Sequence, residues 1–179
     1  MEKISIIKFL AEILMYLFIF FVPILIYFKK VDKVNILKYL KIKENYKDGI
    51  KVGCIVSLIY ISVLLIKNFI NGFNVNFNIG LLWISALIVG FIEEIPFRGF
   101  LLQKLNDKVE FIKANIITSL IFVLFHFPKW LLTGGNIIIN FIQIGIVSFV
   151  FGYLDKEYDS LWPSIICHSV FNLCFFIKL

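Results

Sequence analysis

The sequence has few charged residues, few cysteines and a single arginine. Of its 179 residues, 17% are charged, whereas 60% are hydrophobic and 17% aromatic, and the mean hydropathy is +0.93. Soluble domains have about 25% charged residues, so an ordinary soluble protein is excluded. Cys54, Cys167 and Cys174 lie in apolar segments without a C-x-x-C spacing. Neither a disulfide framework nor a thiolate metal site is indicated.

Six apolar runs predict an all-α, polytopic membrane helical bundle in one membrane-embedded domain, residues 1–179. A bilayer core of about 30 Å takes about 20 apolar residues in a helix, and shorter runs are accepted where polar residues face the bundle interior. The runs are approximately 9–28, 52–66, 79–103, 114–131, 137–154 and 161–177. We interpret the first as a retained span, because it is long and ends in Lys29 and Lys30 without a small-residue cleavage site.

The lysines are unevenly distributed between the two sides of the predicted bundle. Residues 29–51 hold eight of the seventeen lysines, and the same side gains Lys104, Lys108, Lys113 and Lys156. By the positive-inside rule this side is cytoplasmic and both termini are outside. The lipid bilayer therefore explains the basic charge, and no nucleic-acid partner is expected. Frequent lysine, isoleucine and asparagine are typical of an AT-rich bacterial genome, so we expect a multi-pass protein of a bacterial cell membrane.

Two adjacent carboxylates and the only arginine lie at the end of the third run, in FIEEIPFRGF, residues 91–100. A carboxylate near mid-bilayer costs about 2.5–3.5 kcal/mol, so such a cluster indicates a functional site unless it is an ion pair that locks helices together. Glu94 and Arg98 have the i,i+4 spacing of a stabilising pair, whereas Glu93 lies about 100° around the helix. Glu93 is thus available as a general base. Pro96 should kink the helix beside it.

Both histidines of the chain lie inside apolar runs. A lone histidine in a membrane helix is more often a hydrogen-bonding partner between helices than a catalytic group, so each one alone favours a structural role. Phe122 and His126 share a helix face, as do His168 and Asn172. At 1.5 Å per residue from the cytoplasmic end of each span, Glu93, His126 and His168 lie at depths of about 15, 20 and 12 Å. Three helices thus place an acid and two imidazoles in one middle zone.

Three short motifs carry a family resemblance. EEIPFR, FVLFH and HSVFN, in this order on three apolar helices within residues 93–172, resemble the CPBP family of intramembrane proteases, which includes type II CAAX prenyl endopeptidases and bacterial Abi-type proteins. The resemblance implies that the first glutamate and first histidine activate a water, and that the second histidine and its asparagine support the oxyanion. The implied catalytic residues are Glu93, His126, His168 and Asn172, with Glu94, Arg98 and Phe122 as accessory or structural residues.

The predicted activity is hydrolysis of a peptide bond in a membrane-associated peptide or protein substrate, at a site accessible from the cytoplasmic side. The sequence lacks the G-x-S-G serine motif of rhomboids, so the nucleophile must be water; the G-x-G-D and H-E-x-x-H signatures of the aspartyl and zinc types are also absent. Glu93, His126 and His168 could fill three positions of a zinc site. We favour a metal-free glutamate mechanism that requires no cofactor, since no i,i+4 histidine pair exists. The alternative is a non-proteolytic binding protein, such as a bacteriocin-immunity factor, or a small transporter.

Overall fold

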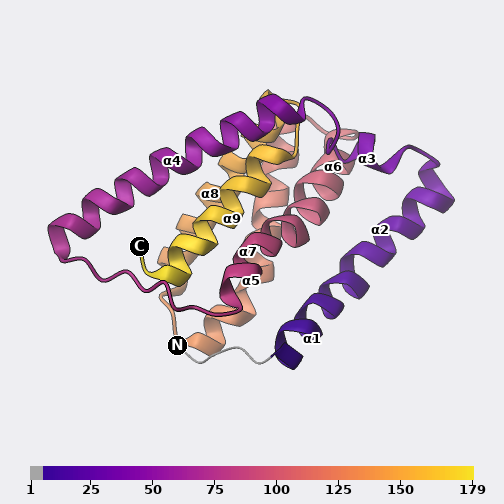
Figure 1. Ribbon diagram of the computed structural model, residues 1–179. Coiled ribbons are helices and arrows are strands. Elements are labelled where there is room, and N and C mark those ends of the chain that lie inside the picture. Colours follow the sequence, from indigo (N-terminus) through magenta and orange to yellow (C-terminus); the bar gives the residue numbers. More distant parts are fainter. Residues whose placement is uncertain (1–5) are drawn as a thin grey trace.

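The computed structural model describes residues 6–179, and the regular structure in this part of the chain is helical (Figure 1). Segments marked η are π-helical, with backbone hydrogen bonds from i to i+5. The elements are α1 (Ile6–Tyr16), η1 (Leu17–Phe21), α2 (Val22–Tyr27), η2 (Phe28–Asp32), α3 (Ile36–Tyr39), α4 (Tyr46–Asn71), α5 (Leu82–Glu94), η3 (Ile95–Leu102), α6 (Gln103–Asn106), α7 (Phe111–Thr133), α8 (Ile137–Glu157) and α9 (Trp162–Ile177).

Within residues 6–179, four helical segments are long and apolar enough to cross a membrane. They are Phe9–Asp32, Tyr46–Asn71, Phe111–Thr133 and Ile137–Glu157. Large apolar side chains on their outer faces are exposed, as at Phe69 (84%) and Leu132 (88%), which is the surface that lipid covers. An all-α membrane bundle is therefore confirmed. The remaining two predicted spans correspond to the shorter α9 and to the α5–η3–α6 segment, so the count of six stays a prediction.

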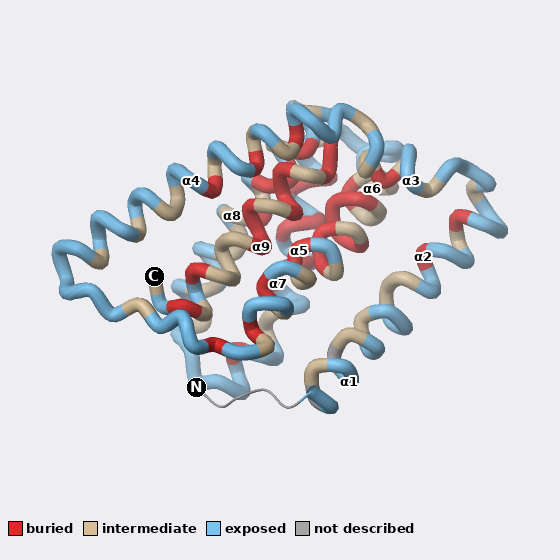
Figure 2. Tube along the Cα trace, in the orientation of Figure 1, coloured by how far each residue is buried: buried red, intermediate tan, exposed pale blue. Residues whose placement is uncertain are grey.

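The core of the bundle lies where α9 packs against α4 and α5, and where α7 packs against α8 (Figure 1). Buried residues gather on the facing sides of α5, η3, α7, α8 and α9, whereas most residues of α1, α2 and α4 are exposed or intermediate (Figure 2). The first helical segment, α1 to η2, lies at the edge of the bundle. Its last residue, Asp32, forms an ion pair with Lys104 of α6. This contact fixes the end of the segment that lies beside the lysine-rich loop.

Pro96 coincides with the start of η3. Proline has no N–H to donate to the carbonyl four residues earlier, so α-helical bonding cannot continue through it. Where the sequence predicts a kink, the chain changes from α5 to a π-helical segment that covers Ile95–Leu102. Such segments are often found at functional sites. The two glutamates of EEIPFR are the last residues of α5, directly before this change.

Gly90 sets the close approach of α5 to α9. A Cβ atom at this position would meet the backbone oxygen of Ile165 and Oγ of Ser169. The Ser169 hydroxyl also donates a hydrogen bond of 3.0 Å to the carbonyl of Leu87, across the same helix pair. Small and hydroxyl residues of this kind allow membrane helices to pack backbone to backbone. The carboxylates at the end of α5 are thereby brought close to the middle of α9.

The Gly90→Ala variant should be less stable than the wild type in detergent. Because the added methyl would press on a backbone oxygen, α9 must shift, and such overpacking costs about 1–3 kcal/mol. Gly145→Ala is the matched control, since its Cβ would lie 3.7 Å from the Val123 side chain, an ordinary contact. Thermal unfolding midpoints of the purified variants measure the difference. Equal midpoints for the two variants would contradict a tight α5–α9 approach.

Candidate active site

Glu94 and Arg98 form a buried ion pair, as their i,i+4 spacing predicts. Arg98 Nη1 lies 3.0 Å from Glu94 Oε2 and 3.2 Å from Oε1. The glutamate is fully buried and the arginine is 1% exposed. Arg98 Nη2 donates to Oγ of Ser148 on α8 at 2.7 Å, and its guanidinium lies over the Phe122 ring, 4.2 Å from the centroid. The pair therefore connects η3 to α7 and α8.

The same glutamate also holds His168. His168 Nδ1 lies 2.5 Å from Glu94 Oε1. A carboxylate in an ion pair with arginine accepts hydrogen bonds, so Nδ1 carries the proton and donates it. The opposite ring nitrogen, Nε2, then faces Glu93. Glu94 thus determines which tautomer of His168 is present and how its ring is oriented, in the way that a carboxylate orients a catalytic imidazole.

Glu93 lies between the two histidines. Its Oε2 atom is 3.4 Å from His126 Nε2 and 3.8 Å from His168 Nε2. Oε2 is buried and makes no hydrogen bond to another group within residues 6–179. Its other oxygen, Oε1, accepts a hydrogen bond of 3.2 Å from the Tyr16 hydroxyl. The structure thus brings together the acid and the two imidazoles that the depth comparison places in one zone, and the catalytic roles of these residues stay a prediction.

His126 is oriented by its own helix. Its Nδ1 lies 2.9 Å from the carbonyl oxygen of Phe122, which can only accept, so Nδ1 is the donor. The Phe122 ring packs on the imidazole with centroids 4.5 Å apart. The i,i+4 pair expected from the sequence is therefore in contact, and Nε2 of His126 is directed to Glu93. Nε2 of His126 and Nε2 of His168 therefore both face the Glu93 carboxylate.

Asn172 is placed differently from the other predicted catalytic residues. Its amide nitrogen donates a hydrogen bond of 3.2 Å to the carbonyl of His168, one turn earlier on α9. The asparagine therefore shares a helix face with His168, as its spacing predicts, but this amide proton is used by the backbone. Its role in oxyanion support stays a prediction.

The sequence analysis did not identify three polar side chains that support the site. The Tyr16 hydroxyl donates to Glu93, and the Ser148 hydroxyl accepts from Arg98. Asp155, at the end of α8, is 2% exposed, and its Oδ1 accepts a hydrogen bond of 3.0 Å from the backbone N–H of Ser164. This carboxylate caps the first turn of α9, the helix that carries His168. Three acidic residues, Asp155, Glu157 and Asp159, precede S-L-W-P-S in the sequence, so the sequence alone does not distinguish the one that forms this cap.

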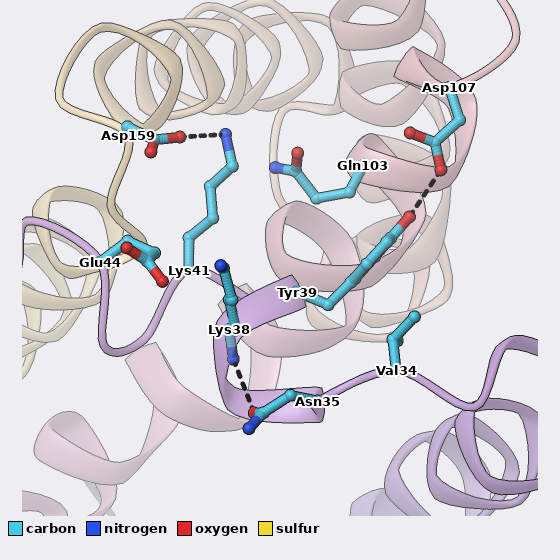
Figure 3. A pocket seen from close by; sticks show the side chains of 9 residues that line it. All are labelled: Val34, Asn35, Lys38, Tyr39, Lys41, Glu44, Gln103, Asp107 and Asp159. Atoms are coloured by element: carbon cyan, nitrogen blue, oxygen red, sulfur yellow. Dashed lines mark hydrogen bonds and ion pairs between the residues drawn. The ribbon is translucent and has the colours of Figure 1, made fainter.

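Two hollows lie near the site. The first, about 580 Å³, is at the lysine-rich end of the bundle, between α3, α6 and the loop before α9 (Figure 3). Burial raises the pKa of Tyr39 in its wall to about 12, and the hydrogen bond that this hydroxyl donates to Asp107 adds to the effect. Gln103 lines the same hollow and donates to the carbonyl of Arg98 at 3.2 Å. The hollow is thus one hydrogen bond from the backbone of the buried arginine.

The second hollow is an apolar groove of about 300 Å³ between the first helical segment and the η3–α7 face. It is lined by Ile19, Phe20, Pro23, Ile24, Pro96, Phe97, Phe100, Leu101, Ile121 and Phe125. The ring of Phe125 lies 5.9 Å from the His126 ring, centroid to centroid. The groove therefore reaches the apolar wall of the candidate site from the lipid side.

The histidine and carboxylate groups do not form a ready metal centre. Among the side chains that the structure describes, no group of three or more His, Cys, Asp or Glu is arranged to hold a metal ion. The metal-free mechanism stays a prediction.

The family relationship rests on one comparison. A family model described as "Type II CAAX prenyl endopeptidase Rce1-like" matches residues 74–174, more than half of the chain. The chain belongs to this family. Membership in the Rce1-like family confirms the resemblance carried by the three motifs, and it supports an integral membrane protein with CAAX-protease-like intramembrane peptidase activity in general. The comparisons with curated proteins and with solved structures gave no match. The matched region contains Glu93, His126 and His168 but not Tyr16.

Arg98→Ala should strongly destabilise the protein. Removing the arginine leaves the fully buried Glu94 carboxylate without its cation, and breaking a buried pair in this way costs about 3–5 kcal/mol. Lys113→Ala is the matched control, because Lys113 forms an i,i+3 pair of 3.7 Å with Glu110 in which both side chains are exposed, and exposed pairs contribute little. Membrane-fraction yield and the unfolding midpoint report both effects. A wild-type midpoint for Arg98→Ala would contradict a structural role for the pair.

Proposed function

We propose that the protein is an intramembrane endopeptidase in which Glu93 and His126 activate a water that attacks a peptide bond of a membrane-associated substrate. The observation that carries the proposal is the convergence of Glu93 Oε2 with Nε2 of both histidines inside an apolar bundle. These distances of 3.4 and 3.8 Å are long for direct hydrogen bonds, and we propose that one water bound beside the three atoms bridges them. Membership in the Rce1-like family supports the reaction class.

The proposed reaction begins with proton transfer from the water to the Glu93 carboxylate. His126 Nε2 accepts the second hydrogen bond of the water and orients its lone pair towards the substrate carbonyl carbon. The C–O bond forms as the carbonyl π bond opens, which places negative charge on the substrate oxygen. The proton held by Glu93 then passes to the amine nitrogen as the C–N bond breaks. The carbonyl re-forms as the amine leaves, and the products are a free amine and a carboxylic acid, which then loses its proton to solvent.

His168 is proposed to stabilise the oxyanion. To donate from Nε2 its ring must carry a proton on both nitrogens, and the Glu94 carboxylate bound at Nδ1 stabilises this imidazolium. Asn172 can add a second donor only if its amide leaves the His168 carbonyl. We therefore propose His168 as the main donor to the oxyanion and Asn172 as an auxiliary donor. No step of this mechanism uses a metal.

The proposed substrate is a peptide held at the membrane. The family description names prenyl endopeptidases, and in a bacterial membrane we expect leader peptides or other membrane-bound peptides to be cleaved. The apolar groove beside η3 offers a route for such a chain from the lipid, and the polar hollow lined by Gln103 offers a route for water from the lysine-rich side. We propose that this side faces the cytoplasm.

Glu93→Gln should abolish cleavage and leave folding intact. The amide keeps the shape of the carboxylate but cannot accept the proton of the water, so we expect a loss of at least about 100-fold. Glu110→Gln, in an exposed pair, is the control. The measurement is a mass-spectrometric comparison of membrane and secreted peptides from cells that carry each variant. Identical peptide sets, together with a cellular phenotype that survives Glu93→Gln, would favour a binding or immunity function without proteolysis.

A cleavage assay with purified wild-type protein, with and without a chelator, tests the metal-free mechanism. Treatment with a chelator should leave cleavage at the wild-type rate, because the carboxylate supplies the base. A loss of activity that added zinc restores would overturn this part of the proposal and make Glu93 a ligand.

A further inference from the structure

Tyr16 reaches the candidate site from a helix that the family match does not include. It is the last residue of α1, directly before η1, and it lies 77 residues from Glu93 in the sequence. Its hydroxyl donates the hydrogen bond of 3.2 Å to Glu93 Oε1. The two oxygens of the carboxylate therefore have different surroundings: Oε1 is held by the tyrosine, and Oε2 faces both imidazoles.

The Tyr16 ring is fixed by aromatic neighbours. Its centroid lies 5.9 Å from Phe20 on the next turn and 6.1 Å, edge to face, from Phe125 on α7. Phe20 packs in turn on Phe125 at 5.3 Å and on Phe97 of η3 at 5.9 Å. Edge-to-face and tilted rings at such separations attract each other beyond their buried area. The cluster holds the first helical segment against η3 and α7 and directs the hydroxyl at the carboxylate.

We propose that Tyr16 is a positioning residue for Glu93, whose hydroxyl holds Oε1 so that Oε2 is presented to the water between the two histidines. This inference rests on the proposed function. A general base must lie within hydrogen-bond reach of the proton that it takes. Without the Tyr16 hydroxyl, rotation about the side-chain bonds of Glu93 would allow Oε2 to leave this position. The first helical segment thus completes the site, although residues 74–174 alone carry the family motifs.

The first arm of the experiment separates positioning from packing. Tyr16→Phe keeps the ring and its contacts and removes only the hydroxyl. Tyr27→Phe is the matched control, because Tyr27 lies on the same helical segment, is also half-buried, and packs its ring on Phe100 at 5.4 Å. Tyr16→Ala removes the ring as well and should lower the unfolding midpoint.

Kinetics are measured in liposomes of phosphatidylethanolamine and phosphatidylglycerol with an internally quenched peptide that ends in a farnesylated C-a-a-X sequence. We expect Tyr16→Phe to lower kcat by about 10-fold or more, with KM changed less than about twofold. The reason is that a misplaced base stabilises the transition state less well but leaves substrate binding unchanged. Tyr27→Phe should match the wild type. Wild-type kcat for Tyr16→Phe, or equal changes in kcat and KM with a lowered midpoint, would overturn the proposal.

The second arm does not need a substrate, so it distinguishes failure of this inference from failure of the proposed function. In protein labelled with 13C at the tyrosine Cζ position, the signal that Tyr16→Phe removes is that of Tyr16. Glu93→Gln should shift this signal, because a neutral amide is a weaker acceptor than a carboxylate, and should leave the Tyr27 signal in place. An unmoved Tyr16 signal would overturn the inference even if the peptide is cleaved. A shifted signal supports the contact even if the wild type does not cleave this peptide.

Discussion

The Glu94 carboxylate connects the ion pair of η3 to the imidazole of α9, and the arrangement of the candidate site depends on it. Arg98 neutralises its charge and His168 shares its Oε1 atom. Without the arginine, a carboxylate in this apolar interior would be strongly unfavourable. Without the carboxylate, His168 would have no acceptor for its Nδ1 proton and no fixed tautomer. The adjacent Glu93 faces the two histidines instead of the arginine.

The surroundings of this connection keep the helices close enough for it to form. Gly90 lets α5 approach the backbone of α9, and Asp155 caps the first turn of α9 from α8. The ring of Phe122 packs on both Arg98 and His126. A polar cluster inside a membrane protein is stable only when its members satisfy one another. Of the two Glu93 oxygens, Oε1 is bound by Tyr16. The other, Oε2, faces both histidines and has no hydrogen-bond partner in the part of the chain that the structure describes.

Local and periodic features could be predicted from the sequence. Hydropathy predicted the membrane helices, and i,i+4 spacing predicted the contacts Glu94–Arg98 and Phe122–His126, because helix geometry fixes which side chains on one helix meet. Counting residues from the span ends also predicted that Glu93 and the histidines share a depth. This estimate depends only on the rise per residue, which varies little.

Contacts between helices could not be predicted in the same way. The bond between Glu94 and His168 joins residues 74 positions apart, and its formation depends on how α9 rotates against α5, which no spacing rule fixes. Tyr16 lies in a helix without a polar motif, so nothing in its neighbourhood distinguished it from the other aromatic residues. The π-helical segment that contains Pro96 also escaped prediction, since a proline is equally compatible with a kink.

The protonation of His168 tests the shared carboxylate most directly. With only two histidines in the chain, solid-state 15N spectra of histidine-labelled protein in lipid are simple, and a His126→Asn variant assigns the remaining signals to His168. We predict that His168 Nδ1 carries a proton in a strong hydrogen bond, and that Glu94→Gln changes its chemical shift. A His168 ring that is unprotonated at Nδ1, or whose signals ignore Glu94→Gln, would contradict the central role of this carboxylate.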